Sequence, residues 1–291
     1  MAPPNAGAFS INLREVFAGA GARGKESRKI EAGEMAVTDV ILEADDLAAV
    51  RAALAAPMAD QQLDWCLQPT AMRKKRLLVA DMDSTIINVE CLDELADFAG
   101  LKAEISAITE RAMRGELAFE GALRERVGML KGLATTALQQ AYDERVRLNP
   151  GARTLVRTMA ANNARCALVS GGFTFFTSRV AQAAGFHSHR ANTLIEADGK
   201  LTGEVGEPIL GKEAKLAALN EDARFIGVPL AATLAVGDGA NDLAMIEASG
   251  LGVAYRAKPI VAAQAHAKVD HCDLTALLYF QGYNAGQFVI D

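Results

Sequence analysis

The sequence predicts an α/β protein built on a parallel sheet with helices on both faces. Short apolar runs at 77–80, 166–169 and 234–236 have the length and composition of buried parallel strands. Stretches of helical pattern separate these runs, and such alternation is typical of parallel α/β sheets. Each run ends in small polar residues, at the sheet edge where such folds bind ligands.

The segment before the first of these strands predicts a smaller unit. Residues 1–33 are rich in Gly, Ala and charged residues and show little periodicity, which favours a flexible N-terminal tail. Residues 34–73 predict a small α/β segment with a strand at 36–42, a helix at 45–54 and an extended return at 63–67.

The core itself is predicted to be interrupted once. Residues 74–88 and 149–291 carry the strand signals, whereas residues 89–148 are helical and charged with almost no β-branched runs. Asp198-Gly199 lies between two short strand-like runs and predicts a hairpin. We therefore expect a Rossmann-like parallel sheet core with a helical insertion after its first strand.

Composition excludes several classes of protein. A net charge of -6 and a pI of about 5.4 argue against a nucleic-acid binder, which would carry a basic face. No apolar run reaches the ~18 residues that span a bilayer, and the N-terminus lacks a secretory signal, so we expect a cytoplasmic protein with no membrane partner. The four cysteines have no CxxC spacing, which argues against disulfides and a zinc site.

Carboxylates follow two of the predicted strands. Asp81 and Asp83 come directly after the first strand, and Asp238 follows the third. Alone, each of these motifs is more often a turn or a helix cap. Together at one sheet edge they offer the oxygen ligands that Mg²⁺ prefers. A carboxylate beside the ion can attack phosphorus, and a second one can protonate the leaving oxygen.

A phosphate site is predicted at the same edge. Ser170-Gly171-Gly172 follows the second strand and is expected to open a helix whose N-terminus and hydroxyl hold phosphate oxygens, although an ordinary turn reads the same way. Lys212 and Lys215 lie on a predicted helix between the second and third strands. Either can neutralise phosphate, and a solvated surface lysine is the alternative.

In chain order, DMDST at 81–85, SGG at 170–172, a lysine and GDGAND at 237–242 resemble the motifs of the haloacid dehalogenase superfamily. The resemblance covers residues 74–275. Within the superfamily, the chain most resembles the phosphoserine phosphatases. This resemblance implies Mg²⁺-dependent hydrolysis of O-phosphoserine through an aspartyl-phosphate intermediate, as the last step of serine biosynthesis. It also implies that the helical insertion at 89–148 is a cap over the site.

The resemblance assigns roles to the matching positions. Asp81 is the nucleophile, and Asp83 protonates the leaving group and then activates water. Mg²⁺ is held by Asp81, the backbone carbonyl of Asp83 and Asp238. The phosphate is contacted by Ser170, Gly171, Lys212 and Asn241. Asp242 supports the metal site. Lys212 is preferred to Lys215 because the family pattern is K-x-x-x-L, which Lys212 and Leu216 fit.

Cap residues are implied to select the substrate. Glu90 is the expected ligand of the substrate ammonium, and Arg126 can grip the carboxylate with two hydrogen bonds. Met113 and Phe119 are expected to enclose the substrate, and Arg124 is a lesser candidate for the carboxylate. Without the resemblance, Glu and Arg on helices more often form surface ion pairs, and Met and Phe more often pack in the hydrophobic core.

Two other functions remain open from the sequence. A related phosphatase or phosphotransferase acting on another small amino-bearing phosphomonoester, such as phosphohomoserine, would carry the same motifs. A non-catalytic binding module on this scaffold would normally lack the nucleophile, yet Asp81 and Asp83 are both present. The expected partner is a small phosphorylated amino acid rather than nucleic acid, and a homodimer and a monomer both remain open.

Overall fold

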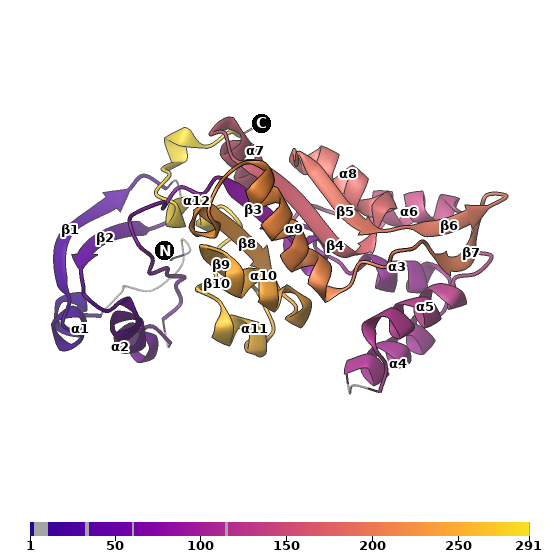
Figure 1. The fold of residues 1–291 in the computed structure, drawn as a ribbon, viewed down its shortest axis with the longest axis horizontal. Helices are drawn as coiled ribbons and strands as arrows, with labels where there is room; N and C mark the ends of the chain where they lie inside the picture. The colour runs from indigo at the N-terminus through magenta and orange to yellow at the C-terminus, as the bar shows by residue number, and fades with distance from the viewer. Residues whose placement is uncertain (3–10, 33–34, 60, 114–115, 291) are drawn as a thin grey trace.

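The computed structural model describes residues 1–2, 11–32, 35–59, 61–113 and 116–290, apart from the side chains of residues 110, 112 and 113. Figure 1 shows a small N-terminal unit at one end, the core sheet in the middle and the helical insertion at the other end. No helix of the described part combines the length and the hydropathy needed to cross a bilayer.

Six strands form one parallel sheet in the order β10-β9-β8-β3-β4-β5. Their bounds are β3 (Leu77–Ala80), β4 (Arg165–Phe173), β5 (Ser188–Asn192), β8 (Thr233–Gly237), β9 (Leu251–Tyr255) and β10 (Ala267–Val269). Strands β3, β8 and β9 are buried along their whole length, as expected where helices cover both faces. The predicted α/β fold class is therefore confirmed.

Alternate residues of β3 face two different cores. Leu78 and Ala80 belong to the larger core, which includes α7 (Ala152–Ala161), α8 (Thr174–Ala184) and α12 (Ala276–Phe280). Leu77 and Val79 pack on the other face against α9 (Lys212–Phe225), α10 (Leu243–Ala248) and α11 (Pro259–Gln264). The period of two along the strand thus builds the helix–sheet–helix layers.

Four α-helices follow the short helical turn Met82–Ile86 in the described part of the chain before α7. They are α3 (Cys91–Phe98), α4 (Lys102–Met113), α5 (Phe119–Met129) and α6 (Thr136–Arg145), and all lie within the predicted insertion. The insertion has two stems, the segments where the chain leaves the core and returns to it. They pair with each other, because Ile87 and Leu148 form an antiparallel bridge. The Asn149 amide donates to the carbonyls of Thr85 at 2.9 Å and Ile87 at 3.0 Å. These bonds fix the point where the insertion leaves the core.

A hairpin of the core leans on this insertion. Strands β6 (Leu194–Ala197) and β7 (Lys200–Val205) are joined by Asp198-Gly199, both with positive φ, so the predicted hairpin is confirmed. Gly132 donates to the Leu201 carbonyl at 2.8 Å.

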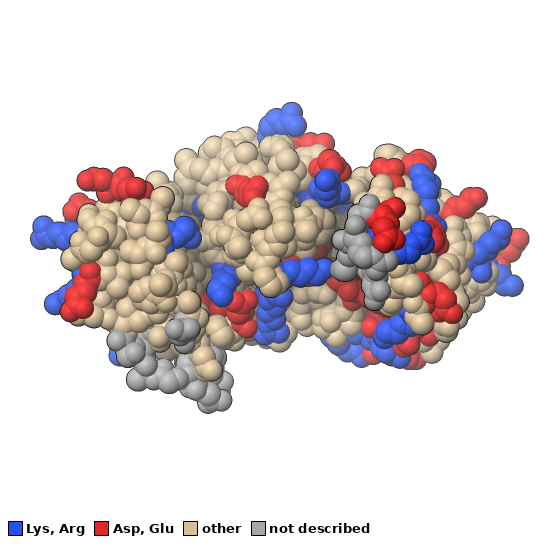
Figure 2. All heavy atoms as spheres, turned by 90° about the horizontal axis from the view of Figure 1, so that it is seen from below, with Lys and Arg blue, Asp and Glu red and all other residues tan. Residues whose placement is uncertain are grey.

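On the face in Figure 2, basic and acidic side chains are interspersed rather than gathered into one basic patch, most densely at the end that carries the insertion.

The N-terminal unit is more ordered than the sequence indicated. It contains α1 (Leu13–Gly19), β1 (Arg23–Ile30), β2 (Val37–Glu43) and α2 (Leu47–Ala59). The prediction of a flexible tail over 1–33 is wrong for residues 11–32, and residues 3–10 and 33 lie outside the described residues. Pairing with β2 holds the charged and almost fully exposed β1, so no apolar pattern marked it.

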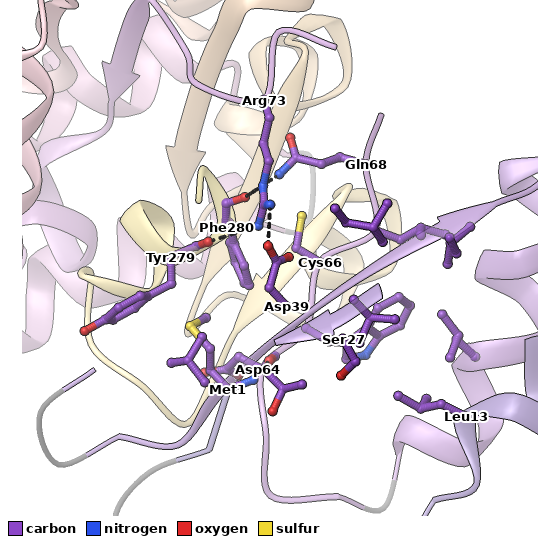
Figure 3. Close-up of a pocket in the computed structure, with 18 of the residues that line it drawn as sticks. Met1, Leu13, Ser27, Asp39, Asp64, Cys66, Gln68, Arg73, Tyr279 and Phe280 are labelled. Carbon is purple, nitrogen blue, oxygen red and sulfur yellow. Dashed lines mark hydrogen bonds and ion pairs between the residues drawn. The ribbon is translucent and has the colours of Figure 1, made fainter. Parts of the chain in front are cut away.

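Polar contacts join this unit to the core around an apolar cavity of about 640 Å³ (Figure 3). Arg73 donates to the Phe280 carbonyl at 2.8 Å and pairs with Asp39 at 2.9 Å. The buried Asp64 carboxylate accepts backbone N–H groups from Asp270 at 2.8 Å and Cys272 at 2.7 Å. The cavity walls come largely from aliphatic and aromatic side chains, including Phe17, Leu54, Met58, Trp65 and Phe280.

Candidate active site

The sheet brings the predicted carboxylates together where the order of the strands reverses, since β4 pairs with one edge of β3 and β8 with the other. Strand β3 lies between β8 and β4, and Asp81 and Asp238 follow the neighbouring strands β3 and β8. This is the crevice in which open α/β sheets bind ligands. Carboxylate oxygens of Asp81, Asp238 and Asp242 lie within 4.8 Å of one another. Such a cluster of hard oxygen donors can hold a metal ion.

A buried lysine joins two of these carboxylates. Lys215 Nζ lies 2.6 Å from Asp81 Oδ1 and 2.6 Å from Asp242 Oδ1, and all three groups are shielded from solvent. Burial lowers the pKa of Lys215, but the two carboxylates together outweigh it and raise that pKa above its usual value. Burial and the charge of Asp242 raise the pKa of Asp81, which Lys215 opposes. One cation beside three carboxylates leaves an excess of negative charge that a divalent cation would balance.

The structure corrects the choice of Lys212. Its side chain is 71% exposed, and its ion pair is with Glu213 at the solvent-facing start of α9. Lys215 instead starts the buried stripe of this helix, followed at helical spacing by Ala218, Leu219, Asp222 and Ala223. That apolar periodicity was visible in the sequence and would have identified Lys215, whereas the K-x-x-x-L pattern did not.

Asp83 is held through both of its oxygens. The Ser170 hydroxyl donates to Oδ2 at 3.0 Å, and the backbone N–H of Cys91, the first residue of α3, donates to Oδ1 at 2.9 Å. Burial still raises the pKa of Asp83 against these hydrogen bonds. A raised pKa suits a carboxyl group that must give up a proton and later accept one.

Ser170-Gly171-Gly172 lies beside Asp83, but the expectation that it opens a helix is wrong. Strand β4 continues to Phe173, and α8 begins at Thr174. A Cβ atom on Gly172 would lie 3.0 Å from Asp83 Oδ2 and 3.0 Å from Ser170 Oγ, so any other residue would force these two side chains to move by a few tenths of an ångström. The motif therefore forms the end of a strand just before a helix, and the Gly172 N–H donates to Ser170 Oγ at 2.8 Å.

Asn241 and Asp242 lie in a short 3₁₀ turn, Ala240–Asp242, that follows β8. The second oxygen of Asp242 accepts the Gly239 N–H at 3.0 Å while the first faces Lys215. Asp242 is thus committed to internal contacts and supports the cluster from behind. The half-buried Asn241 folds its amide oxygen over Gly239 at the edge of the site.

Thr85 and Ser84 make contacts that the sequence did not predict. The Thr85 hydroxyl donates to Asp238 Oδ1 at 3.2 Å, which leaves the other oxygen of Asp238 for a metal ion. The Ser84 hydroxyl donates to Glu90 Oε1 at 2.6 Å. Burial and the charge of Asp83 raise the pKa of Glu90 to about 7.

The inserted helices bring Arg126 to the same side. Its guanidinium donates to Thr109 Oγ1 at 3.4 Å and is half-buried, and burial lowers its pKa while Asp93 and Glu90 act against that. Arg124, the lesser candidate, is exposed and pairs with Glu207.

Phe119 lies over the end of β4 and remains partly exposed. Its ring carbon Cζ lies 3.4 Å from the position that a Cβ on Gly171 would occupy, so the first residue of α5 covers the end of β4. Met113 is the last residue of α4, and its side chain lies outside the described part. The structure thus brings Glu90 close to the carboxylates of the sheet, Phe119 to the end of β4, and Arg126 into the neighbourhood of Glu90.

Comparison with known proteins identifies the family of this arrangement. Residues 78–247 match the family model of the haloacid dehalogenase-like hydrolases. A phosphoserine phosphatase of Polaromonas sp. is 46% identical over 208 residues, which cover 70% of this chain and 88% of that protein. A phosphoserine phosphatase of Archaeoglobus fulgidus is 42% identical, with 80% of this chain and 68% of that protein covered.

Solved structures share the same fold. A HAD family hydrolase from Salmonella enterica serovar Typhi superposes with a TM-score of 0.82 at 30% identity and covers 92% of each chain. A substrate-bound phosphoserine phosphatase gives a TM-score of 0.66 at 38% identity over 71% of this chain and 98% of that one. The Salmonella protein therefore shares more of the chain than the second structure does.

Proposed function

Because the chain belongs to the haloacid dehalogenase-like hydrolase family and is a phosphatase, we propose that it hydrolyses O-phosphoserine to serine and phosphate. The observation that carries this is the position of Glu90 and Arg126. Glu90 lies at the start of the insertion, where the charges of Asp83 and Asp238 act on it. Arg126 lies on α5, close enough to Glu90 for that carboxylate to influence its pKa. An anion and a cation placed opposite a phosphate site match the ammonium and carboxylate of an amino acid.

The chemistry proceeds in two displacements. An Asp81 oxygen attacks phosphorus and forms an aspartyl-phosphate, while the bond from phosphorus to the seryl oxygen breaks. Asp83 gives its proton to that oxygen, and serine leaves. Asp83 then takes a proton from water, whose oxygen attacks phosphorus and breaks the bond to Asp81. Lys215 holds the Asp81 carboxylate in place throughout.

We propose Mg²⁺ as the resident ion, held by Asp81, Asp238 and the backbone carbonyl of Asp83. The remaining oxygens of Asp81 and Asp238 fit this role, because Lys215 and Thr85 already occupy the other two. When bound, the ion offsets the negative charge of the phosphoryl group. Ser170, Gly171, Lys215 and Asn241 would contact the phosphate.

The substrate test is phosphate release from a panel of small phosphomonoesters, with Mg²⁺ and with chelator. We expect phosphoserine to be the best substrate and chelator to abolish turnover. Equal rates on phosphoserine and para-nitrophenyl phosphate would contradict the assignment of the cap residues. A higher rate on phosphohomoserine, or transfer to an alcohol acceptor, would favour the related enzymes that share these motifs. A best rate on phosphoserine supports a place at the end of serine synthesis.

A further inference from the structure

We propose that Ser84 is a positioning residue for substrate selection, holding the Glu90 carboxylate toward the site so that it meets the substrate ammonium. The inference rests on the proposed function, because Glu90 needs a cationic group to recognise. It adds a residue that touches neither phosphate nor ammonium and acts only through Glu90.

Ser84 contacts two successive residues at the start of the cap. Its backbone N–H donates to the Val89 carbonyl at 3.2 Å, and its hydroxyl donates to Glu90 Oε1 at 2.6 Å. These bonds close the loop from 84 to 90 upon itself. Because Asp83 is the neighbour of Ser84, the loop sets the position of Glu90 relative to the acid–base carboxyl group.

Glu90 needs such a partner because its own helix does not hold it. It stands at the N-cap of α3 but makes no side-chain capping hydrogen bond there. Glu90 is exposed, and the charges of Asp83 and Asp238 act on it. Like charges push a flexible carboxylate outward to solvent. A hydroxyl donor on the site side opposes that movement.

The backbone of Ser84 supports a functional reading. Ser84 has φ 56° and ψ -5°, in the left-handed region that glycine occupies without strain. Residues kept in this region despite strain cluster where a site requires their side chain. Glycine would satisfy the turn better, but it would remove the only atom that reaches Oε1 from this position.

Two variants separate the hydroxyl from the backbone. Ser84→Gly relieves the left-handed strain and Ser84→Ala retains it, yet both remove the donor. We expect both to lower kcat/KM for phosphoserine roughly tenfold, mainly through KM, because a charge-assisted contact is misplaced. Turnover of para-nitrophenyl phosphate should stay within about twofold. Ser84→Asn, which tolerates this backbone and carries an amide donor, should recover part of the preference.

A double-mutant cycle with Glu90→Gln tests whether Ser84 acts through Glu90. In the Glu90→Gln background, adding Ser84→Gly should change kcat/KM for phosphoserine by less than about twofold. Additive losses, or equal losses on both substrates, would overturn the positioning role. If the wild-type protein prefers phosphoserine and Ser84→Gly keeps this preference in full, the positioning role of Ser84 is wrong while the proposed function stands. A wild-type protein that does not hydrolyse phosphoserine would overturn both.

Discussion

Asp81 is a carboxylate in surroundings that oppose its charge. It is buried, Asp242 lies close to it, and both raise its pKa, with Lys215 as the compensating cation. Such arrangements cost stability and are kept where chemistry needs them. The proposed nucleophile is therefore a weak point of the folded state.

Asp81→Asn should abolish turnover and keep the fold. An amide of the same shape cannot attack phosphorus, so we expect a loss of about a thousandfold or more in kcat. Because one of the crowded charges disappears, Tm should be unchanged or higher. Steady-state kinetics and thermal unfolding check the two parts, and near-normal turnover would refute the aspartyl-phosphate route.

The two lysines of α9 provide a matched pair. Lys215→Met should lower kcat/KM by about a hundredfold on phosphoserine and on para-nitrophenyl phosphate, because the phosphoryl group is common to both. Lys212→Ala should stay within about twofold, since that side chain is solvated. A larger loss for Lys212→Ala than for Lys215→Met would reverse the assignment.

Residue by residue, the sequence was informative where chemistry follows strand ends. Asp81, Asp83 and Asp238 could be located because short buried strands end immediately before them. The choice between Lys212 and Lys215 depended on which face of α9 is buried. The K-x-x-x-L spacing alone did not determine that face. The hydrogen bond from Ser84 to Glu90 depends on a left-handed backbone conformation at Ser84, which no residue pattern in the sequence predicts.

At the scale of elements, the cap is held to the core through its stems. Asn149→Ala removes two hydrogen bonds to the carbonyls of Thr85 and Ile87, which belong to buried residues. We expect the free energy of unfolding to fall by about 1–3 kcal/mol. Gln140→Ala, which removes one exposed bond to Glu144, should cost about 0.5 kcal/mol or less and is the control. Equal effects in urea unfolding would show that the stems are not anchored by Asn149.

Elements with a strong local signal were predictable. The helical insertion and the Asp198-Gly199 hairpin follow from periodicity and turn chemistry that act over a few residues. The strand β1 was missed because its exposed, charged residues are held by pairing with β2. The helix expected to open at Ser170-Gly171-Gly172 begins later, at Thr174, because β4 runs on to Phe173.

At the scale of the whole molecule, the N-terminal unit joins the core through contacts between distant parts of the chain. Arg73 reaches the end of α12 at Phe280, and Asp64 reaches the loop at 270–272. Local patterns carry no information on such contacts. The sequence therefore indicated that this unit exists but not where it docks.

Arg73→Met tests the docking and its dependence on pH. Losing the bonds to Asp39 and the Phe280 carbonyl should lower the free energy of unfolding by about 1–3 kcal/mol. Burial raises the pKa of Asp39, but Arg73 and Arg28 together overcome it and hold that pKa below its usual value. A depressed carboxyl pKa stabilises the fold above the unfolded-state value, about 3.9, and this stability is lost as pH falls through the folded-state value.

The wild-type protein should therefore lose more stability than Arg73→Met between about pH 5 and acid conditions near pH 2. Arg28→Ala is the control, because Arg28 meets the same carboxylate from an exposed position and should have a smaller effect. Both variants should keep kcat/KM, since none of these groups touches the carboxylate cluster at Asp81. Unfolding free energies measured across this range decide the point. Parallel pH profiles for wild type and Arg73→Met would show that the ion pair between Asp39 and Arg73 does not contribute to the stability of the fold.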